Sequence, residues 1–276
     1  MRWVNGCAAD SLSLADRAFQ FGDGVFRSLR CEGGGIPYWG RHLAKLAADC
    51  AALGIAAPDE AVWHADLQLA APADAAIKLT VTRGESVRGY AVPQTSLPNR
   101  VLQLAPLPPP PPGQGVRVRW CEMRAGWQPR LAGVKHLNRL ENVMARAEWC
   151  DPEVFEGLLL DRDGHVLEGV MSNVLALSGR VLFTPRLDGG GVAGVMRGVA
   201  IDAAARVGVA VRETALTPAS LLAADRLWLS NSLIGLVPVR ELAGQHWGTH
   251  PLDAAFAEAI AAIRKEETLW LQPAAA

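Results

Sequence analysis

Lys135 is the residue in this sequence best placed to act as an amine nucleophile. It stands in the run 131–142, where Ala132, Gly133 and Val134 precede it and apolar residues at helical spacing follow it. We therefore expect Lys135 at the mouth of a helix, at the edge of a buried region. The apolar positions of that helix are Leu137, Leu140, Val143, Met144 and Ala147.

A lysine in such a place allows two interpretations. Its aliphatic stem can pack against apolar neighbours while the ammonium reaches water. Alternatively, burial lowers the pKa of the amine because the charged form loses hydration, and a neutral amine attacks an aldehyde to give a Schiff base. The chemistry elsewhere in the chain has to decide between them.

Two features of the second half of the chain are suited to an anion. Gly194, Val195 and Met196 open a predicted helix, and the free N–H groups and the dipole at a helix start favour an anion such as phosphate. The run 230–232, Ser-Asn-Ser, places hydroxyl and amide donors at a predicted strand end. Each feature alone is equally typical of an ordinary turn or loop cap.

Glu168 is an acid among apolar residues that follow a predicted hairpin strand. If its side chain turns outward, it is simply solvated. If it turns inward, it needs a partner, because a buried lone carboxylate is costly, and a protonated ring nitrogen would serve. An amine for an aldehyde, donors for a phosphate and an acid for a pyridinium are together the parts of a pyridoxal phosphate (PLP) site.

The elements that must position these residues alternate between helices and strands, which predicts an α/β (α+β) fold of two lobes. We expect a smaller N-terminal domain over 1–106, a Pro-rich linker over 107–113 and a larger domain over 114–276 that carries the lysine. Five consecutive prolines in the linker cannot continue a helix or a central strand. A ligand for a proline-binding module is the alternative interpretation of that run.

The helices and strands are predicted from apolar periodicity and turn residues. Helices are expected over 39–53, 58–69, the segment after Lys135, 191–207 and 252–265. Strands are expected over 2–4, 25–31, 76–82, 101–107, 116–123, 157–161, 165–167, 173–177, 180–184 and 226–229.

The composition excludes several classes of function. The 276 residues carry a formal net charge of −1, which gives no electrostatic reason to expect nucleic acid or an anionic membrane as a partner. Five cysteines without a CxxC pair argue against a disulfide framework or a zinc site. Neither a signal-peptide core nor an apolar run of about 18 residues occurs. We therefore expect a cytoplasmic protein without a bound metal.

Several motifs in the chain resemble those of one family, the fold-type IV PLP enzymes or class IV aminotransferases. They occur in the family's order across nearly the whole chain. The matching segments are 13–24, 82–84, 133–141, 167–169 with 172–173, 194–197, and 231–232 with 238–239.

The resemblance implies a role for each matched residue. Lys135 corresponds to the lysine that forms a Schiff base with the cofactor and moves protons once substrate displaces it. Glu168 corresponds to the carboxylate that keeps the pyridine nitrogen protonated. Val195 and Met196 correspond to backbone donors to the cofactor phosphate, and Ser232 to a hydroxyl donor.

One position departs from the family pattern. The family has His-x-x-Arg-Leu, with the arginine on the phosphate, whereas here the segment that begins at His42 has Lys45 in that place. A lysine gives a point charge instead of a planar fork, so the phosphate contact should differ. Arg41, one helical turn before Lys45, is a second candidate for that contact.

The residues expected to bind the substrate are Arg88 and Tyr90, because they follow the 82–84 motif where D-amino acid aminotransferases of the family bind a carboxylate. A solvated loop arginine is the alternative for Arg88. Arg27 and Arg30 point to opposite faces of their predicted strand, so at most one of them reaches a pocket.

The 135–141 run is most similar to family members that cleave 4-amino-4-deoxychorismate to 4-aminobenzoate and pyruvate, a step of folate biosynthesis. That lyase activity on a small-molecule substrate is the expected function. An aminotransferase of D- or branched-chain amino acids is the alternative, and a non-catalytic PLP-binding or other ligand-binding protein is a third. Relatives in the family are homodimers, so a homodimer is expected here by resemblance.

Overall fold

The computed structural model describes residues 1–87 and 89–271, and these form two compact units. The first unit contains 1–108, 134–138 and 267–271, and the second contains 109–133 and 139–266. The first boundary falls inside the run 107–113 that the sequence predicts as a linker. The division differs from the predicted one, because Lys135 and the C-terminal strand belong to the first unit.

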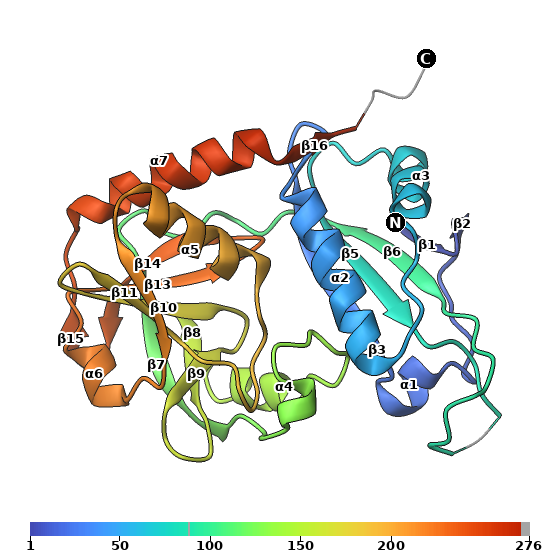
Figure 1. Cartoon of the computed structure of the whole chain (residues 1–276), viewed down its shortest axis with the longest axis horizontal. Helices are drawn as coiled ribbons and strands as arrows, with labels where there is room; N and C mark the ends of the chain where they lie inside the picture. The colour runs from blue at the N-terminus through green and yellow to red at the C-terminus, as the bar shows by residue number, and fades with distance from the viewer. Residues whose placement is uncertain (88, 272–276) are drawn as a thin grey trace. The chain divides into compact units, whose positions relative to one another are not determined.

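A five-stranded antiparallel sheet organises the first unit, in the strand order β2-β1-β6-β5-β3 (Figure 1). Alternate side chains of its strands face the core, as expected for a sheet with one covered face. Leu29 of β3 and Leu79 of β5 are both fully buried. The strands are β1 (Arg2–Val4), β2 (Cys7–Ala8), β3 (Gly24–Cys31), β5 (Ala75–Thr82) and β6 (Arg100–Ala105).

Helix α2 (Trp39–Leu53) packs on β3 and agrees with the helix predicted there. Its buried face contains Trp39, His42, Leu46 and Cys50, which recur at helical spacing. The helix ends at Gly54, whose φ of 65° suits a residue without a Cβ atom. The other elements of this unit are α1 (Arg17–Phe21), α3 (Glu60–Ala70), and the pair β4 (Gly35–Pro37) and β16 (Thr268–Trp270).

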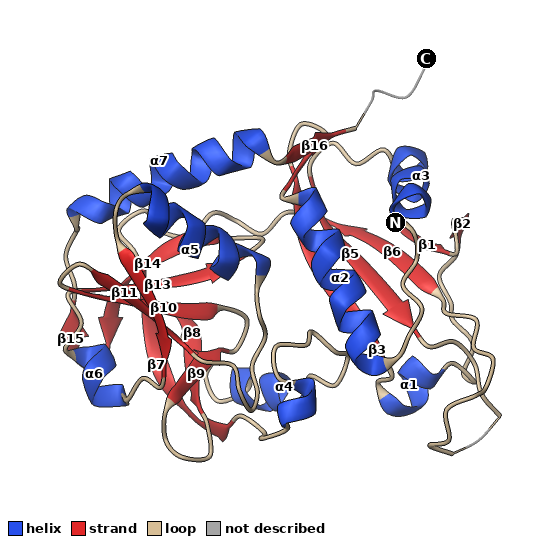
Figure 2. Ribbon diagram, in the orientation of Figure 1, coloured by secondary structure: helices blue, strands red, loops and turns tan. Residues whose placement is uncertain are grey.

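A nine-stranded mixed sheet forms the second unit, in the order β12-β11-β10-β13-β14-β7-β8-β9, with β15 paired to β14 (Figure 2). A tight turn joins β9, at one end of this order, to β10, near the other, so the sheet curls on itself. The strands are β7 (Val116–Arg124), β8 (Val154–Leu160), β9 (Val166–Gly169), β10 (Asn173–Ser178), β11 (Val181–Pro185), β12 (Ala210–Thr214), β13 (Arg226–Asn231), β14 (Gly235–Leu242) and β15 (Gln245–His246).

Helix α5 (Val195–Arg206) packs against α7 (Pro251–Glu266) and against β13 in this unit. Its buried residues Met196, Val199 and Ala203 anchor it in the core. The remaining helices are η1 (Pro129–Leu131), α4 (Leu140–Arg146) and α6 (Pro218–Leu222).

The predicted helix after Lys135 is the clearest difference from the sequence expectations. The helix does not begin at the lysine, because α4 starts at Leu140 and the segment before it instead forms an isolated β-bridge between His136 and Val25. Its apolar side chains do not face a core within the chain either: Leu140, Val143 and Met144 are 69, 62 and 54% exposed. The apolar periodicity was therefore real, but it marks an exposed surface.

Three strands of the second unit were not predicted: β12, β14 and the two-residue β15. β12 is an edge strand with mostly polar, partly exposed residues, so it lacks an apolar signal. β14 contains Pro238, a residue that argues against an interior strand, and its pairing with β7 shifts register just after that proline.

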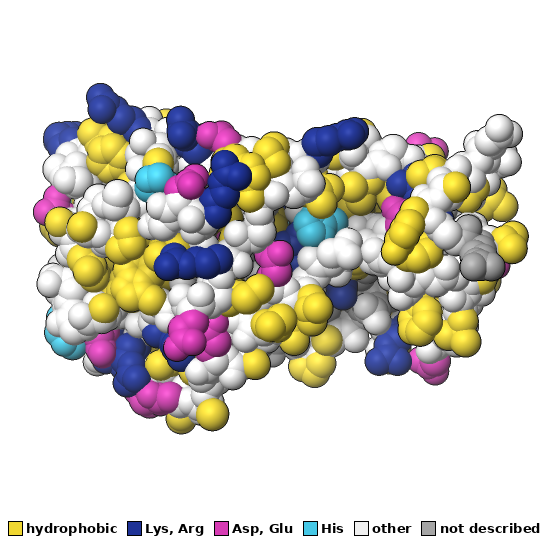
Figure 3. Space-filling view, turned by 90° about the horizontal axis from the view of Figure 1, so that it is seen from below, with side chains coloured by type: hydrophobic (Ala, Val, Ile, Leu, Met, Phe, Trp, Pro, Cys, Tyr) yellow, Lys and Arg dark blue, Asp and Glu magenta, His cyan; other side chains and the backbone are white. Residues whose placement is uncertain are grey.

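The surface carries both signs of charge, interspersed with apolar side chains on the face seen in Figure 3. No helix within residues 1–87 and 89–271 combines the length and the apolar character needed to cross a lipid bilayer.

A buried ion pair ties α7 to the sheet and should contribute strongly to stability. Arg226 is 2% exposed, and its Nε and Nη2 donate to the Asp253 carboxylate at 3.0 and 2.9 Å. Asp253→Ala should lower the free energy of unfolding by about 3–5 kcal/mol, because it leaves a buried guanidinium without its counter-ion. Urea titration measures the loss. Glu258→Ala, on an exposed position of α7, is the control, and equal losses in both variants would contradict the prediction.

Candidate functional site

The backbone around Lys135 is fixed by β3 in the first unit. The Phe26 N–H donates to the Lys135 carbonyl at 3.0 Å, and the Leu137 N–H donates to the Gly24 carbonyl at 2.9 Å. The Lys135 side chain is half-buried, with Nζ 4.6 Å from the centroid of the Phe26 ring. The lysine is therefore held by a segment that pairs with β3, an edge strand of the sheet, and not by the expected helix end.

A buried carboxylate, Asp49, gathers the charged groups near Lys135. Its Oδ2 accepts the backbone N–H of Lys135 at 3.2 Å. The guanidinium of Arg27 and the ammonium of Lys45 both contact the same carboxylate, which is 1% exposed. Two cations and a backbone donor on one anion form a network in which each group fixes the others.

Lys45, the residue in place of the family arginine, thus lies beside Lys135 within the first unit. Burial lowers the pKa of the Lys45 ammonium, and the charge of Arg27 acts in the same direction, while its hydrogen bond with Asp49 opposes them. Its side chain keeps 22% exposure, so the ammonium can be shared between Asp49 and an incoming anion.

Arg41, the second candidate for the phosphate, has a different partner. Its Nε and Nη2 each donate to the Glu267 carboxylate at 2.6 Å, the bidentate geometry that arginine forms with a carboxylate. A phosphate at this position would have to compete with Glu267.

The 13–24 and 82–84 motifs meet at Asp23. Its Oδ2 accepts from Nε of Arg17 at 2.8 Å and from Nε of Arg83 at 2.7 Å. Burial raises the pKa of the Asp23 carboxyl, but the hydrogen bonds and charges of Arg83 and Arg17 outweigh burial and hold the pKa below its usual value. The carboxylate therefore stays ionised and fixes both arginines.

Arg17 extends this cluster to the segment where substrate residues are predicted. Its guanidinium also donates to the carbonyls of Gly89, Tyr90 and Ala91 at 3.0, 3.3 and 3.2 Å. The Tyr90 side chain is 85% exposed, with its ring centroid 5.2 Å from that of Phe21. Arg88, the other predicted substrate residue, lies outside the described residues.

Glu168 lies on β9 in the second unit and is turned inward, at 6% exposure. Its Oε2 accepts the N–H of Val192 at 2.8 Å, and the carbonyl of the same Val192 accepts from Nδ2 of Asn173 at 2.8 Å. The outward orientation considered for Glu168 is thereby excluded. Asn173 matched the family motif without an assigned role, and its part here is to hold the segment ahead of α5.

The start of α5 is shaped to leave backbone donors available. Gly194 is the N-cap residue, and no side chain caps the helix. A Cβ atom at Gly194 would come within 2.2 Å of Oδ1 of Asn173, so this position requires glycine. Val195 and Met196 follow at 8 and 2% exposure, and the N–H groups of a first helical turn lack intrahelical partners. This arrangement suits a phosphate.

Ser232 lies, half-buried, in the turn between β13 and β14. Asn231 fixes that turn, because its Oδ1 accepts the N–H groups of Leu233 and Ile234 at 2.9 and 3.0 Å. Its Nδ2 donates to the Met171 carbonyl at 3.0 Å, which links the turn to the loop after Glu168.

The segment that leads to Lys135 is bonded to the segment that leads to α5. The Gly133 N–H donates to the Gly191 carbonyl at 3.0 Å, and the Ala193 N–H donates to the Gly133 carbonyl at 3.0 Å. Val192, the residue that Glu168 and Asn173 hold, therefore pairs side by side with Gly133.

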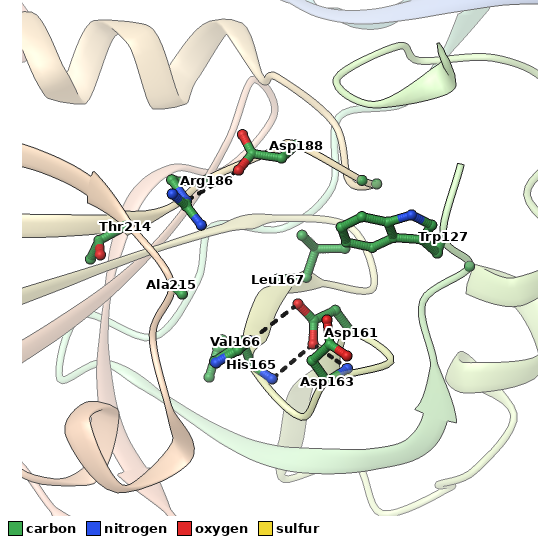
Figure 4. A pocket seen from close by; sticks show the side chains of 13 residues that line it. Trp127, Asp161, Asp163, His165, Val166, Leu167, Arg186, Asp188, Thr214 and Ala215 are labelled. Atoms are coloured by element: carbon green, nitrogen blue, oxygen red, sulfur yellow. Dashed lines mark hydrogen bonds and ion pairs between the residues drawn. The ribbon is translucent and has the colours of Figure 1, made fainter. Parts of the chain in front are cut away.

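A cavity of about 120 Å³ borders this region of the second unit. Figure 4 shows the Trp127 indole on one side of it and the ion pair of Arg186 with Asp188, at 3.1 Å, on another. The indole packs on Gly189, where a Cβ atom would come within 2.2 Å of the ring. Leu167 lines the cavity, but Glu168, Val195 and Met196 do not.

The donor set fits the parts of PLP. Glu168 is a buried carboxylate that accepts from Val192, and a carboxylate has about four lone-pair sites, which suits it to accept from a protonated ring nitrogen. The start of α5 presents main-chain donors for a phosphate, and Lys135 presents an amine for an aldehyde. The structure therefore provides the groups that the sequence predicted for this cofactor.

A comparison with protein families covers most of the segments that carry these motifs. The model of the amino-transferase class IV family matches residues 24–242. This chain belongs to the class IV aminotransferases, and the family expected from its motifs is confirmed.

Individual relatives cover nearly the whole chain. The aminodeoxychorismate lyase of Vibrio harveyi is 36% identical, across 87% of this chain and 90% of its own length. The crystal structure of 4-amino-4-deoxychorismate lyase from Pseudomonas aeruginosa matches with a TM-score of 0.90 at 41% identity, covering 95% of this chain and 98% of that one. A putative branched-chain-amino-acid aminotransferase of Methanocaldococcus jannaschii is 30% identical, across 88% of each chain. These matches confirm the fold-type IV architecture.

His42 heads the segment that carries Lys45, and it is buried at 2% exposure. Burial lowers the pKa of its imidazole to about 3, and the positive charge of Arg27 acts in the same direction. The folded protein therefore keeps His42 neutral at pH values where the unfolded chain, with a pKa of about 6.5, binds a proton.

This difference should make the protein acid-sensitive. The contribution of His42 to the free energy of unfolding is constant above about pH 6.5. It falls as the pH drops from there toward 3, because only the unfolded state gains the proton. Between pH 7 and 4.5, His42→Leu should lose about 3 kcal/mol less unfolding free energy than the unmodified protein. Urea titrations at both pH values measure the difference, with His246→Leu, at an exposed position of β15, as the control. Equal pH dependence in His42→Leu and the unmodified protein would contradict the prediction.

Proposed function

We propose that this protein is a PLP-dependent lyase that converts 4-amino-4-deoxychorismate to 4-aminobenzoate and pyruvate. The observation that carries the proposal is the similarity to two lyases of that name over nearly the full chain, at higher identity than to the aminotransferase described above. The run from Lys135 to Glu141 supports the same conclusion.

The chain would bind the cofactor at its aldehyde carbon, at its ring nitrogen and at its phosphate. Lys135 would carry it in the absence of substrate, Glu168 would keep the pyridine nitrogen protonated, and the N–H groups of Val195 and Met196 would bind the phosphate together with the Ser232 hydroxyl. Bound PLP supplies an aldehyde that condenses with the substrate amine and a protonated ring that withdraws electrons from the neighbouring carbon.

Lys135 follows, two residues later in the chain, a residue of the second unit that pairs with Val192, the residue that Glu168 binds. Gly133 pairs with Val192, and Val192 donates to Glu168 at 2.8 Å. Two peptide units separate Gly133 from Lys135, so their Cα atoms lie within about 8 Å of each other. The lysine is thus tied by the backbone to the segment that the carboxylate holds.

Lys135 moves the proton on which the reaction depends. After the substrate amine has replaced it, its free amine removes the proton from C4 of the substrate. The bond between C3 and the ether oxygen then breaks, enolpyruvate leaves, and the carbocycle becomes aromatic. Lys135 would return a proton to the methylene carbon of enolpyruvate, which gives pyruvate and restores the neutral amine, and that amine would then displace the aminobenzoate amine from the cofactor. Positioning and polarisation are the main tasks of the protein, because aromatisation provides the driving force.

The substrate carries two carboxylates, which calls for cationic and hydroxyl donors. Arg88 and Tyr90 are the proposed donors. The support for Tyr90 is that Arg17 holds the backbone of 89–91 through three carbonyls, so the segment has a fixed course beside the Asp23 cluster.

The proposed assembly is a homodimer, as in other members of the family, acting in the cytoplasm on the route to folate. The exposed apolar face of α4, formed by Leu140, Val143 and Met144, supports an assembly that covers it. The same side chains would explain the apolar spacing that the sequence shows after Lys135.

An aminotransferase acting on D- or branched-chain amino acids is the second candidate, and the relative from Methanocaldococcus jannaschii favours it. An aminotransferase requires a 2-oxo acid acceptor, whereas the lyase does not. Purified protein with PLP should therefore be given aminodeoxychorismate alone, and separately an amino acid with 2-oxoglutarate. Aminobenzoate fluorescence in the first reaction supports the lyase. Amino transfer in the second without aminobenzoate in the first would replace it, and PLP binding without either product would leave a non-catalytic binder.

Removing the Lys135 amine should abolish most of the activity. Lys135→Ala should lower turnover of aminodeoxychorismate by about 10²–10⁴-fold, the effect of losing a positioned acid–base group. Lys78→Ala is the matched control, because the Lys78 ammonium lies 4.9 Å from the same Phe26 ring centroid. Borohydride reduction and peptide mapping should place a pyridoxyl group on Lys135, and a pyridoxyl group on another lysine would contradict the assignment.

Single substitutions can show how much Lys45 and Arg41 each contribute to binding of the phosphate. Lys45→Ala should weaken PLP binding about tenfold, the loss of one charge-assisted hydrogen bond. Arg41→Ala should weaken it less, because Arg41 also holds Glu267. Titration of the apo-protein with PLP measures both, and Glu267→Ala shows how much of the Arg41 effect comes from the lost ion pair. If Arg41→Ala leaves PLP affinity unchanged, Arg41 takes no part in phosphate binding.

A further inference from the structure

Glu156 is a fully buried carboxylate on β8 that the proposed mechanism does not use. Its Oε1 accepts the N–H of Gly157 at 3.1 Å. Its Oε2 accepts the N–H of Met171 at 3.1 Å and the hydroxyl of Ser172 at 2.8 Å. These donors are uncharged, so the carboxylate is stabilised by hydrogen bonds where burial would otherwise make it costly.

The turn between β9 and β10, residues 169–172, is built around this carboxylate. The Gly169 N–H donates to the Ser172 carbonyl at 2.7 Å, which closes the turn, and the Val170 N–H donates to the Gly157 carbonyl at 2.9 Å. A Cβ atom at Gly169 would come within 2.9 Å of Oε2 of Glu156 and 2.4 Å of the Ser172 hydroxyl. The space between turn and carboxylate therefore admits only glycine at position 169.

Both ends of the turn carry residues that hold the segment ahead of α5. Glu168 precedes the turn and accepts from the Val192 N–H, while Asn173 follows it and donates to the Val192 carbonyl, each at 2.8 Å. A shift of the turn would move both side chains at once. The Val192 peptide lies just before Gly194, where the first turn of α5 begins.

We propose that Glu156 is a positioning residue for the cofactor site. Its carboxylate holds the 169–172 turn, and through that turn it sets Glu168 and Asn173 against Val192 and the start of α5. The inference rests on the proposed function in so far as Glu168 and α5 are taken to bind PLP. Glu156 itself touches neither cofactor nor substrate in this account.

The protonation of Glu156 gives this role a distinctive signature. Burial raises the pKa of its carboxyl to about 7, against the hydrogen bonds from Ser172 and from the backbone of Met171, Gly157 and Val170. When ionised, the carboxylate only accepts, which suits these donors, whereas protonation turns one acceptor into a donor. The turn should therefore be held best above about pH 7.

The neighbouring titratable groups are Cys121, Glu148 and Glu168. Cys121 on β7 interacts electrostatically with Glu156, and burial raises the pKa of its thiol to about 12, so it stays neutral. Glu148, the next acid beyond Cys121, is paired with Arg119 at 3.4 Å. Glu168 on β9 is bonded to Val192.

Glu156→Gln tests the proposal, because glutamine has the same size and resembles the protonated acid. PLP affinity of the apo-protein is measured by titration at pH 8.5 and at pH 5.5. Relative to the unmodified protein, the dissociation constant should rise about tenfold at pH 8.5 and by less than about twofold at pH 5.5. A merely structural role would change affinity by the same factor at both pH values, and that result would overturn the proposal.

Two further variants keep the test decisive. Glu153→Gln, exposed just before β8, is the matched control and should leave the dissociation constant unchanged at both pH values. If Glu156→Gln does not fold, Ser172→Ala removes one hydrogen bond to the carboxylate and should raise the dissociation constant about threefold at pH 8.5. No change in Ser172→Ala would overturn the proposal in that case.

The outcomes separate this inference from the proposed function. If the unmodified protein binds PLP but forms no aminobenzoate, the lyase assignment fails while the affinity ratios still decide the role of Glu156. If the unmodified protein does not bind PLP, both fail. If aminobenzoate forms and the affinity ratio does not depend on pH, only the role of Glu156 fails.

Discussion

The peptide group of Val192 is the point on which the second unit's part of the site depends. Its N–H is taken by Glu168 and its carbonyl by Asn173, each at 2.8 Å, while the strand-like pairing with Gly133 lies alongside. One peptide therefore fixes a carboxylate, the start of α5 and the segment that leads to Lys135. The two side chains that hold this peptide, Glu168 and Asn173, are buried at 6 and 5% exposure, so water has little access to these contacts.

Asp49 plays the corresponding part in the first unit. It is a buried anion that binds Arg27, Lys45 and the backbone of Lys135. A network of this kind is stable only when every member is present, because each charge removed leaves another without compensation. Lys45, which stands in place of the family arginine, thus shares the Asp49 carboxylate with Arg27 of β3.

The sequence predicted the elements with strong apolar periodicity and the residues within family motifs. Helices α2 and α5 and most strands agree with their patterns, and Glu168 is inward as the PLP interpretation requires. The role of Asp49 could hardly be predicted, because its partners Arg27 and Lys135 come from remote segments. Only its position one helical turn after Lys45 pointed to a contact with that lysine. Glu156 stands just before the strand predicted over 157–161, so no pattern marked it as buried. The prediction of a helix directly after Lys135 was wrong. Pairing of this segment with β3 is a long-range interaction, and it overrides the local helical spacing.

The start of α5 has a consequence for how such a protein can be studied. The groups proposed to bind the phosphate there are amide hydrogens, which every residue except proline supplies equally. An alanine scan across 194–196 would thus leave those donors in place and report only steric effects, chiefly at Gly194 where Asn173 is close. Backbone ester substitution removes the amide hydrogen itself, so it would measure the contribution of these donors that side-chain mutagenesis leaves unchanged.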